Sequence, residues 1–168
     1  LKVVAYDPYL SSERAKDLGV EKVELDMLFQ RADFISLHTP LTEATRNIIN
    51  ANAISRMKDG VRIINCARGG IINETDIVTA VQSGKVAGCA LDVYEEEPCP
   101  EDSPLRGEPN IVMTPHLGAS TAEAQESVGI EVAEAITDFL MNGAVRNAVN
   151  MPSLDAKAYE AVKPYLEL

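Results

Sequence analysis

Arg68, Glu97 and His116 are the side chains of this sequence that are best suited to acid-base chemistry. They stand in the segments 65–70 (NCARGG), 91–98 (LDVYEEEP) and 114–120 (TPHLGAS). A guanidinium can donate two parallel hydrogen bonds to a carboxylate, and an imidazole can transfer a proton near neutral pH. A carboxylate can hold that imidazole by a hydrogen bond. Brought together, the three side chains could bind a small acid and move a proton on it.

Each of these segments follows a short apolar run that is rich in β-branched residues. The runs are 61–65 (VRIIN), 86–91 (VAGCAL) and 111–113 (IVM), and helical patterns separate or follow them. This alternation predicts an α/β fold with a doubly wound, Rossmann-like parallel sheet. Because parallel strands end at the same edge of a sheet, we expect Arg68, Glu97 and His116 to gather in one crevice there.

The rest of the chain continues the alternation. Further strands are expected at 1–6, 20–24 and 34–38, and residues 94–110 form a long, acidic, proline-rich loop without periodicity. The expected helix caps are Ser11 or Ser12, Asn52, Asn73 with Asp76, and Ser120 with Glu123, the last opening a long helix that ends near Gly143.

Composition limits the classes of function. The chain has 168 residues, 46% of them hydrophobic, which is enough for a domain with its own core. A net charge of −11 argues against nucleic acid or an anionic membrane as a partner. Cys66, Cys89 and Cys99 form no CxxC pair, which favours a reducing cytoplasm over a disulfide scaffold. No run is long and apolar enough to span a membrane, and with only His38 and His116 we expect no metal site.

Asp7 ends the first expected strand, and two interpretations of it stay open. An acidic residue at the end of the second strand of a dinucleotide-binding fold accepts hydrogen bonds from a ribose and favours NAD over NADP. Asp7-Pro8 is also an ordinary signal for a turn after a strand.

A dinucleotide-binding fold normally contains a strand followed by G-x-G-x-x-G, and this chain has no such segment. The doubly wound order would place that strand between the strands at 1–6 and 34–38. We therefore expect these residues to be part of a longer protein, to leave two unpaired sheet edges, and to be inactive alone.

The three segments, together with 5–9 (AYDPY) and 36–45 (SLHTPLTEAT), resemble the D-2-hydroxyacid dehydrogenases over residues 1 to about 154. The resemblance implies an NAD-binding domain over 1–143, with 144–168 returning toward a substrate domain and beginning a C-terminal region. Residues 115–125 (PHLGASTAEAQ) most resemble members that oxidise 3-phosphoglycerate to 3-phosphohydroxypyruvate in serine biosynthesis. Glyoxylate or hydroxypyruvate reduction is an alternative, as is an NAD(H)-sensing protein of the corepressor type.

The same resemblance implies a role for each matched residue. Arg68 would bind the substrate carboxylate, Glu97 would pair with His116, and His116 would act as the general acid and base. The implied NAD contacts are Asp7, Thr39, Cys66, Ala67, Arg68, Asp92, His116, Gly118 and Ala119. The implied assembly is a cytoplasmic homodimer or homotetramer that acts on a small 2-hydroxy acid.

Each role has a structural alternative. Arg68 could be a buried arginine paired with a carboxylate, and the run Glu95 to Glu97 could be a solvated loop face. His38 is expected to be a hydrogen-bonded histidine rather than a catalytic one.

Overall fold

The computed structural model of the chain describes residues 1–118, 120–146 and 148. The chain divides into two compact units, residues 1–117 and the residues from Gly118 on.

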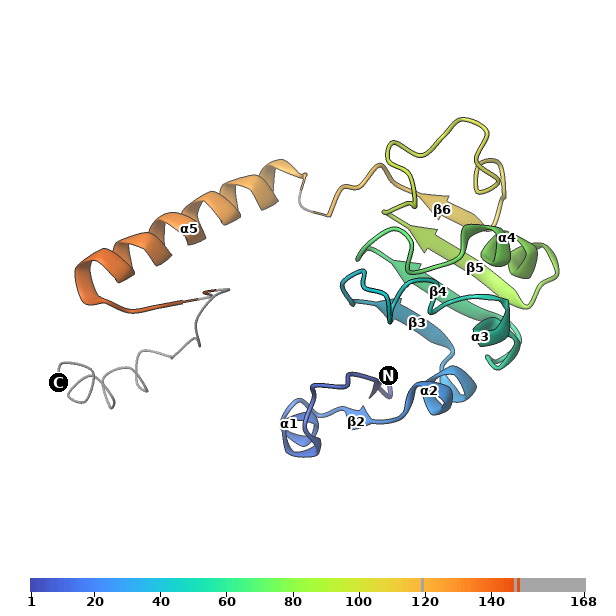
Figure 1. Cartoon of the computed structure of the whole chain (residues 1–168), viewed down its shortest axis with the longest axis horizontal. Coiled ribbons are helices and arrows are strands. Elements are labelled where there is room, and N and C mark those ends of the chain that lie inside the picture. The colour runs from blue at the N-terminus through green and yellow to red at the C-terminus, as the bar shows by residue number, and fades with distance from the viewer. Residues whose placement is uncertain (119, 147, 149–168) are drawn as a thin grey trace. The chain divides into compact units, whose positions relative to one another are not determined.

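The chain opens with a small parallel sheet of two strands. These are β1 (Val4–Ala5) and β2 (Glu21–Lys22), joined by helix α1 (Ser12–Asp17) (Figure 1). Ser11 caps α1 as expected, since its side chain accepts a hydrogen bond from the Arg14 backbone N–H. Both strands are much shorter than the runs predicted at 1–6 and 20–24.

A second sheet has four parallel strands in the order β3-β4-β5-β6. Its elements are α2 (Leu25–Arg31), β3 (Phe34–Leu37), α3 (Ala51–Ser55), β4 (Val61–Asn65), α4 (Glu74–Gln82), β5 (Val86–Leu91) and β6 (Ile111–Met113). The predicted parallel α/β fold is confirmed, and the last three strands have the bounds that their β-branched runs predicted. The carboxyl ends of β3 to β6 lie next to one another at one edge of this sheet.

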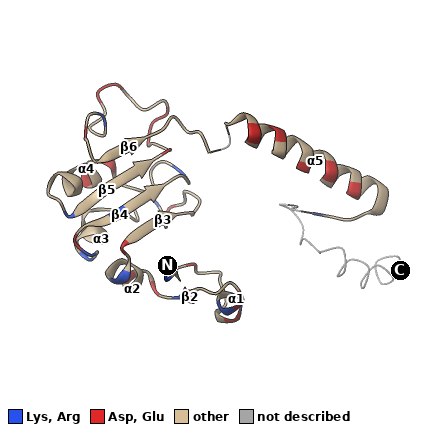
Figure 2. Ribbon diagram, turned by 180° about the vertical axis from the view of Figure 1, so that it is seen from behind, with Lys and Arg blue, Asp and Glu red and all other residues tan. Residues whose placement is uncertain are grey.

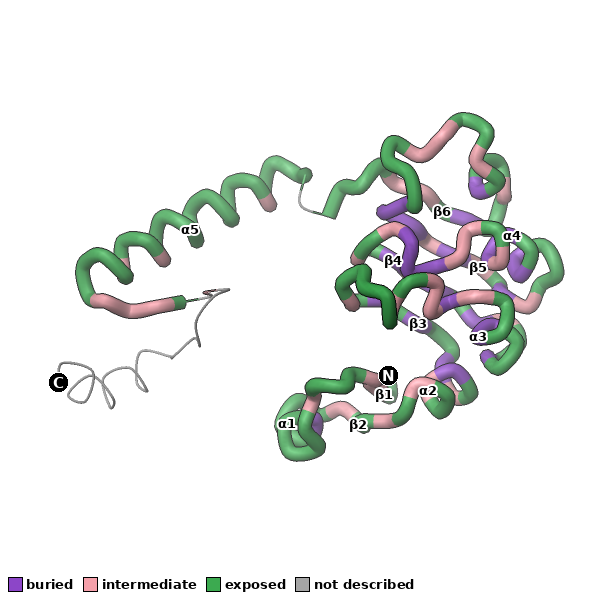
Figure 3. Tube along the Cα trace, viewed as in Figure 1, coloured by how far each residue is buried: buried purple, intermediate pink, exposed green. Residues whose placement is uncertain are grey.

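The core of the first unit lies on one face of the four-stranded sheet. Ile35, Ile63, Cys89 and Ile111 stand in one row across the four strands and are all buried. On the same side, α4 contacts β5 and α3 contacts α4 (Figure 3). Phe34 and Val112 belong to the opposite face and are 61% and 63% exposed. The burial pattern along β3 and β4 therefore alternates, because only one face of the sheet is covered among the described residues.

The two sheets are separate, whereas a complete doubly wound fold has one continuous sheet. Among the described residues, β1 pairs only with β2, and β3 pairs only with β4. These are the two edges that the sequence predicted to lack a partner.

Two of the predicted helix caps were wrong by one or two residues. The side chain of Asn50, not Asn52, accepts the Ala53 backbone N–H at the start of α3. The side chain of Thr121, not Ser120, accepts the Ala124 N–H at the start of helix α5 (Ala122–Asn142). Several polar residues stand before each of these helices, and only the backbone conformation decides which one reaches the N–H groups.

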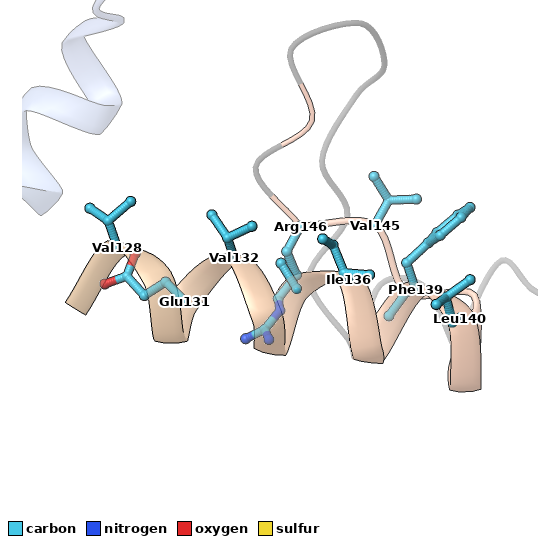
Figure 4. A pocket seen from close by; sticks show the side chains of 10 residues that line it. Val128, Glu131, Val132, Ile136, Phe139, Leu140, Val145 and Arg146 are labelled. Atoms are coloured by element: carbon cyan, nitrogen blue, oxygen red, sulfur yellow. The ribbon is translucent and has the colours of Figure 1, made fainter. Parts of the chain in front are cut away.

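The second unit is dominated by α5, which ends at Gly143 in the left-handed conformation. The charged residues of α5 are all acidic (Figure 2), and none of its residues is buried. Along one side of α5, apolar side chains that include Val128, Val132, Ile136 and Phe139 line a groove of about 400 Å³ (Figure 4). No helix in the described part of the chain is both long and apolar enough to cross a membrane. Most of the predicted tail, 144–168, lies outside the described residues.

Candidate active site

Arg68 lies in a turn that the last residue of β4 builds. Asn65 is 2% exposed, its Oδ1 accepts the Ala67 N–H at 3.0 Å, and its Nδ2 donates to the Arg68 carbonyl at 2.9 Å. Arg68 itself is exposed, and its guanidinium donates to the Ala67 carbonyl at 2.6 Å. Within the described residues it forms no ion pair, so the alternative of a buried arginine paired with a carboxylate does not describe it.

Glu97 lies in the long loop between β5 and β6 and bonds in two directions. Its Oε1 accepts the Tyr94 backbone N–H at 3.1 Å, and its Oε2 lies 2.7 Å from Nδ1 of His116. The hydrogen bond with His116, followed by that from Tyr94, holds the pKa of the Glu97 carboxyl below its usual value. The peptide bond between Glu97 and Pro98 is cis. Of the three glutamates from 95 to 97, Glu97 is therefore the one that bonds to the histidine.

His116 follows β6 and has a left-handed backbone, with φ at 56°. This conformation is uncommon for a residue with a side chain and costs about 1–3 kcal/mol, so surrounding contacts have to maintain it. Asp92, which is 5% exposed, supplies two of them. Its Oδ1 accepts from the Thr114 hydroxyl at 2.6 Å and from the Leu117 N–H at 2.7 Å. Asp92 is thus bonded to the residues on both sides of His116, through the Thr114 side chain and the Leu117 backbone.

The Tyr94 side chain links the loop after β5 to the loop after β6. Its hydroxyl donates to the Thr114 carbonyl at 2.6 Å and lies 3.0 Å from the Leu91 carbonyl, so it spans the ends of β5 and β6. The pKa of the Tyr94 hydroxyl is raised, and burial is the largest cause. A phenol with a raised pKa remains a hydrogen-bond donor at neutral pH.

A cavity of about 560 Å³ lies beside the pair of Glu97 and His116. It is lined by Tyr94, Glu97, Pro98, Cys99, Arg106, Met113, Thr114, Pro115 and His116. Arg106 donates to the carbonyls of Pro100 and Cys99, at 2.7 Å and 2.6 Å, and thereby closes the loop on itself. Arg68 is not among the lining residues.

The predicted NAD contacts lie at the ends of several strands. Thr39 follows β3, Cys66 and Ala67 follow β4, and Asp92 follows β5. Asp7 follows β1 in the smaller sheet, is exposed, and accepts the Tyr9 N–H at 2.8 Å, as its turn interpretation expects. Gly118 begins the second unit, and Ala119 lies outside the described residues.

Thr39 provides a test of whether a nucleotide fits these positions. Its Oγ1 is buried and has no hydrogen-bond partner among the described residues. A buried hydroxyl without a partner costs about 1–3 kcal/mol, and a polar ligand at the carboxyl end of β3 would supply the missing bond. This unpaired hydroxyl suits a polar ligand, of which a nucleotide is one, at this edge of the sheet.

The remaining histidine bonds to a neighbouring side chain, whereas Cys66 follows β4 and Cys99 lines the cavity. The Nε2 of His38 lies 2.8 Å from the Ser36 hydroxyl, as expected for a hydrogen-bonded histidine. All three cysteines are free, and burial raises the pKa of the Cys89 thiol to about 12. In the described ranges no three His, Cys, Asp or Glu side chains are grouped to hold a metal.

Sequence reasoning missed two residues that shape the site. Asn65 builds the arginine turn, and Glu74 accepts the Glu95 N–H at 2.7 Å. An asparagine at the end of an apolar strand was a usable signal for the first. The second depends on which loops touch, and no local pattern reports that. Gly69 lies against the Tyr94 carbonyl, a close backbone approach of the kind that a glycine permits.

Comparison with known proteins gives one consistent result. Residues 1–118 match the family model of the D-isomer specific 2-hydroxyacid dehydrogenase, NAD binding domain. The whole chain is 51% identical to a D-3-phosphoglycerate dehydrogenase of Synechocystis sp., of which it covers 30%, and 46% identical to one of Archaeoglobus fulgidus, of which it covers 32%. A glyoxylate reductase from Paecilomyes thermophila superposes with a TM-score of 0.73 at 34% identity, over 89% of this chain and 45% of that one. The chain thus spans about a third of the length of these curated relatives.

Proposed function

Because this chain belongs to the D-isomer-specific 2-hydroxyacid dehydrogenases, we propose that it carries the acid-base part of an NAD-dependent dehydrogenase for 3-phosphoglycerate. The product would be 3-phosphohydroxypyruvate, an intermediate of serine biosynthesis. The observation that supports this most directly is the bond of 2.7 Å between Glu97 and His116 at the strand ends. The names of the curated relatives support the choice of substrate.

In this proposal Arg68 binds the substrate. Its guanidinium is exposed and bonds only to a backbone carbonyl among the described residues, so a substrate carboxylate can replace that weak partner. The planar group then forms two charge-assisted hydrogen bonds, which fix the orientation of the hydroxyl-bearing carbon.

His116 moves the proton. Its Nδ1 is held by Glu97, so transfer of the hydroxyl proton falls to Nε2. The Glu97 carboxylate stabilises the imidazolium that forms, and the ties from Asp92 keep the ring in place. The chemistry that NAD would supply when bound is that of a hydride acceptor for the substrate carbon. In the reverse direction His116 returns its proton to the keto oxygen.

We assign the NAD contacts to the positions that the family pattern matches. Thr39, Cys66, Ala67, Arg68 and Asp92 would hold the cofactor at the main sheet, and the same pattern assigns contacts to His116, Gly118 and Ala119. Asp7 would bind the adenosine ribose and discriminate against a 2′-phosphate.

A steady-state assay of the whole protein tests this proposal. NADH formation from 3-phosphoglycerate and NAD should proceed with a higher kcat/KM than NADH consumption with glyoxylate or hydroxypyruvate. Faster turnover of glyoxylate would instead favour the reductase alternative, for which the structural neighbour provides support. NAD(H) binding with no turnover of any of these acids would favour a sensing protein of the corepressor type.

The wider organisation is part of the same proposal. Residues 1–143 would form the NAD-binding domain, and 144–168 would lead back to a substrate domain and into a C-terminal region. We propose a homodimer or homotetramer in the cytoplasm, supported by the exposed apolar side of α5 and by the free cysteines. Light scattering of the whole protein would test the assembly.

A further inference from the structure

The peptide group between Tyr94 and Glu95 is held on both of its polar sides. Its N–H, which belongs to Glu95, donates to Oε1 of Glu74 at 2.7 Å. Its carbonyl, which belongs to Tyr94, lies against Gly69, where an added Cβ would be only 1.6 Å from the oxygen. This peptide plane therefore has little freedom to rotate or shift.

The same peptide lies between the two halves of the candidate site. On one side, the Tyr94 N–H donates to Oε1 of Glu97, whose other oxygen holds His116. On the other side, Gly69 directly follows Arg68 in the chain. A rotation of this peptide would thus disturb the support of Glu97 and the packing of the arginine turn together.

Glu74 is well placed to fix this peptide. It is the first residue of α4, directly after the N-cap Asn73, and it is half-buried. Helix α4 packs on β5 through buried residues such as Ile77 and Val81, so the carboxylate stands on a rigid element. A backbone N–H that donates to a carboxylate forms one of the stronger hydrogen bonds in proteins. Burial is the main cause that raises the pKa of Glu74, as expected for a carboxylate withdrawn from water.

We propose that Glu74 is a positioning residue of the dehydrogenase site, which fixes the Tyr94–Glu95 peptide and so couples the Arg68 turn to the pair of Glu97 and His116. The kinetic consequence rests on the function proposed above. The structural consequence does not, because it concerns only the geometry of the loop. Glu74 bonds to the Glu95 backbone N–H and not to the His116 or Arg68 side chain, so its effect has to pass through the backbone.

The kinetic test compares three variants of the whole protein. Glu74→Ala removes the acceptor, and kcat with 3-phosphoglycerate should fall about tenfold while the Kd for NAD changes little, since small displacements of catalytic groups cost rate. Glu74→Gln keeps an acceptor oxygen and should retain most of the kcat. Glu96→Ala, which removes an exposed carboxylate from the same loop, is the matched control and should leave kcat unchanged.

A second measurement does not depend on activity. In the unmodified protein, hydrogen exchange of the Glu95 amide should be slow, because the N–H is bonded. In Glu74→Ala the imidazole NMR signal of His116 should move, while that of His38 should not. His116→Asn and His38→Gln variants would assign the two signals.

The outcomes separate this inference from the proposed function. An unchanged kcat and an unmoved His116 signal in Glu74→Ala would overturn the positioning role. In the unmodified protein, exchange of the Glu95 amide at the rate of an unprotected amide would also overturn the positioning role. This measurement holds even if Glu74→Ala does not fold. If the unmodified protein does not oxidise 3-phosphoglycerate but its His116 signal still responds to Glu74→Ala, the proposed function fails and the positioning role stands.

Discussion

Two carboxylates hold the candidate catalytic histidine, and they act on different parts of it. Glu97 bonds to the imidazole through Nδ1, whereas Asp92 accepts from the Thr114 hydroxyl before the histidine and from the Leu117 backbone N–H after it. The ring orientation and the left-handed backbone are thus maintained separately. At this scale the predictions concern single side chains whose chemistry can be changed while the backbone is kept.

Replacing His116 tests proton transfer. His116→Asn suits the left-handed backbone, which asparagine adopts more readily than most residues, but it removes the general base. We expect kcat of the whole protein to fall roughly a hundredfold or more, with little change in NAD affinity measured by NADH fluorescence. His38→Gln should leave kcat unchanged. A rate close to that of the unmodified protein would exclude His116 from the mechanism.

Arg68→Lys keeps the positive charge but loses the planar pair of donors. We therefore expect a lower kcat/KM for the acid substrate, mainly through a higher KM, in steady-state kinetics. Arg14→Lys, at an exposed position of α1, is the control for a loss of guanidinium elsewhere. Equal kcat/KM for Arg68→Lys and the unmodified protein would argue against carboxylate binding by Arg68.

Glu97 should titrate at a lower pH than an ordinary glutamate does. Its pKa lies below the ordinary value of 4.5, first because His116 donates to it and then because the Tyr94 N–H does. A lowered pKa in the folded state means that the Glu97 carboxylate is ionised at neutral pH and that its stabilising bonds are lost as the pH falls through that lowered value. Carbon NMR of the Glu97 carboxyl should show this midpoint, and His116→Ala should raise it. A midpoint that His116→Ala leaves unchanged would contradict the pairing.

At the scale of elements, the site is made by loops that touch after the strands end. The turn after β4 and the loop after β5 approach so closely at Gly69 that no side chain fits between them. The loop after β6 is then tied to the loop after β5 by Asp92 and Tyr94. Parallel neighbouring strands bring the loops to one edge, but these contacts set their final positions.

Gly69→Ala should show how tightly the loops are packed. The added Cβ would lie 1.6 Å from the Tyr94 carbonyl oxygen, so the two loops have to separate. We expect a loss of about 1–3 kcal/mol in the free energy of unfolding, measured with urea, and a lower kcat. Gly129→Ala in α5 meets no atom within 4 Å and should hold or raise stability, by up to about 1 kcal/mol. Equal stability of the two variants would contradict the close approach at Gly69.

At the scale of the molecule, the proposed cofactor contacts are divided between two sheets. Thr39, Cys66, Ala67 and Asp92 follow strands of the larger sheet, whereas Asp7 follows β1 of the smaller one. A dinucleotide that uses all of them has to reach both sheets, with its adenosine end at Asp7. A substitution at Asp7 should then change the preference between NAD and NADP without changing the acid-base chemistry at His116.

Asp7→Ala tests that separation in the whole protein. Without the carboxylate the ribose loses an acceptor and a 2′-phosphate is no longer repelled, so the ratio of kcat/KM for NAD to that for NADP should fall. The maximal rate with saturating NAD should change little. Asp17→Ala, at the end of α1, is the matched control. An unchanged ratio would leave Asp7 with only its turn bond to Tyr9.

The sequence by itself determined the parallel α/β fold and the chemical identity of the candidate site. Strands such as β4 and β5 were predictable because β-branched runs and their polar ends are local signals, and the motifs carried Arg68, Glu97 and His116 with them. It missed Glu74 and misplaced two helix caps, at Asn52 and Ser120. Only the tertiary structure decided that the Tyr94–Glu95 peptide joins the arginine turn to the Glu97 loop, and that Asp92 maintains the left-handed backbone of His116. Those contacts join residues of different loops, and their geometry depends on how the strands pair, which no local pattern encodes.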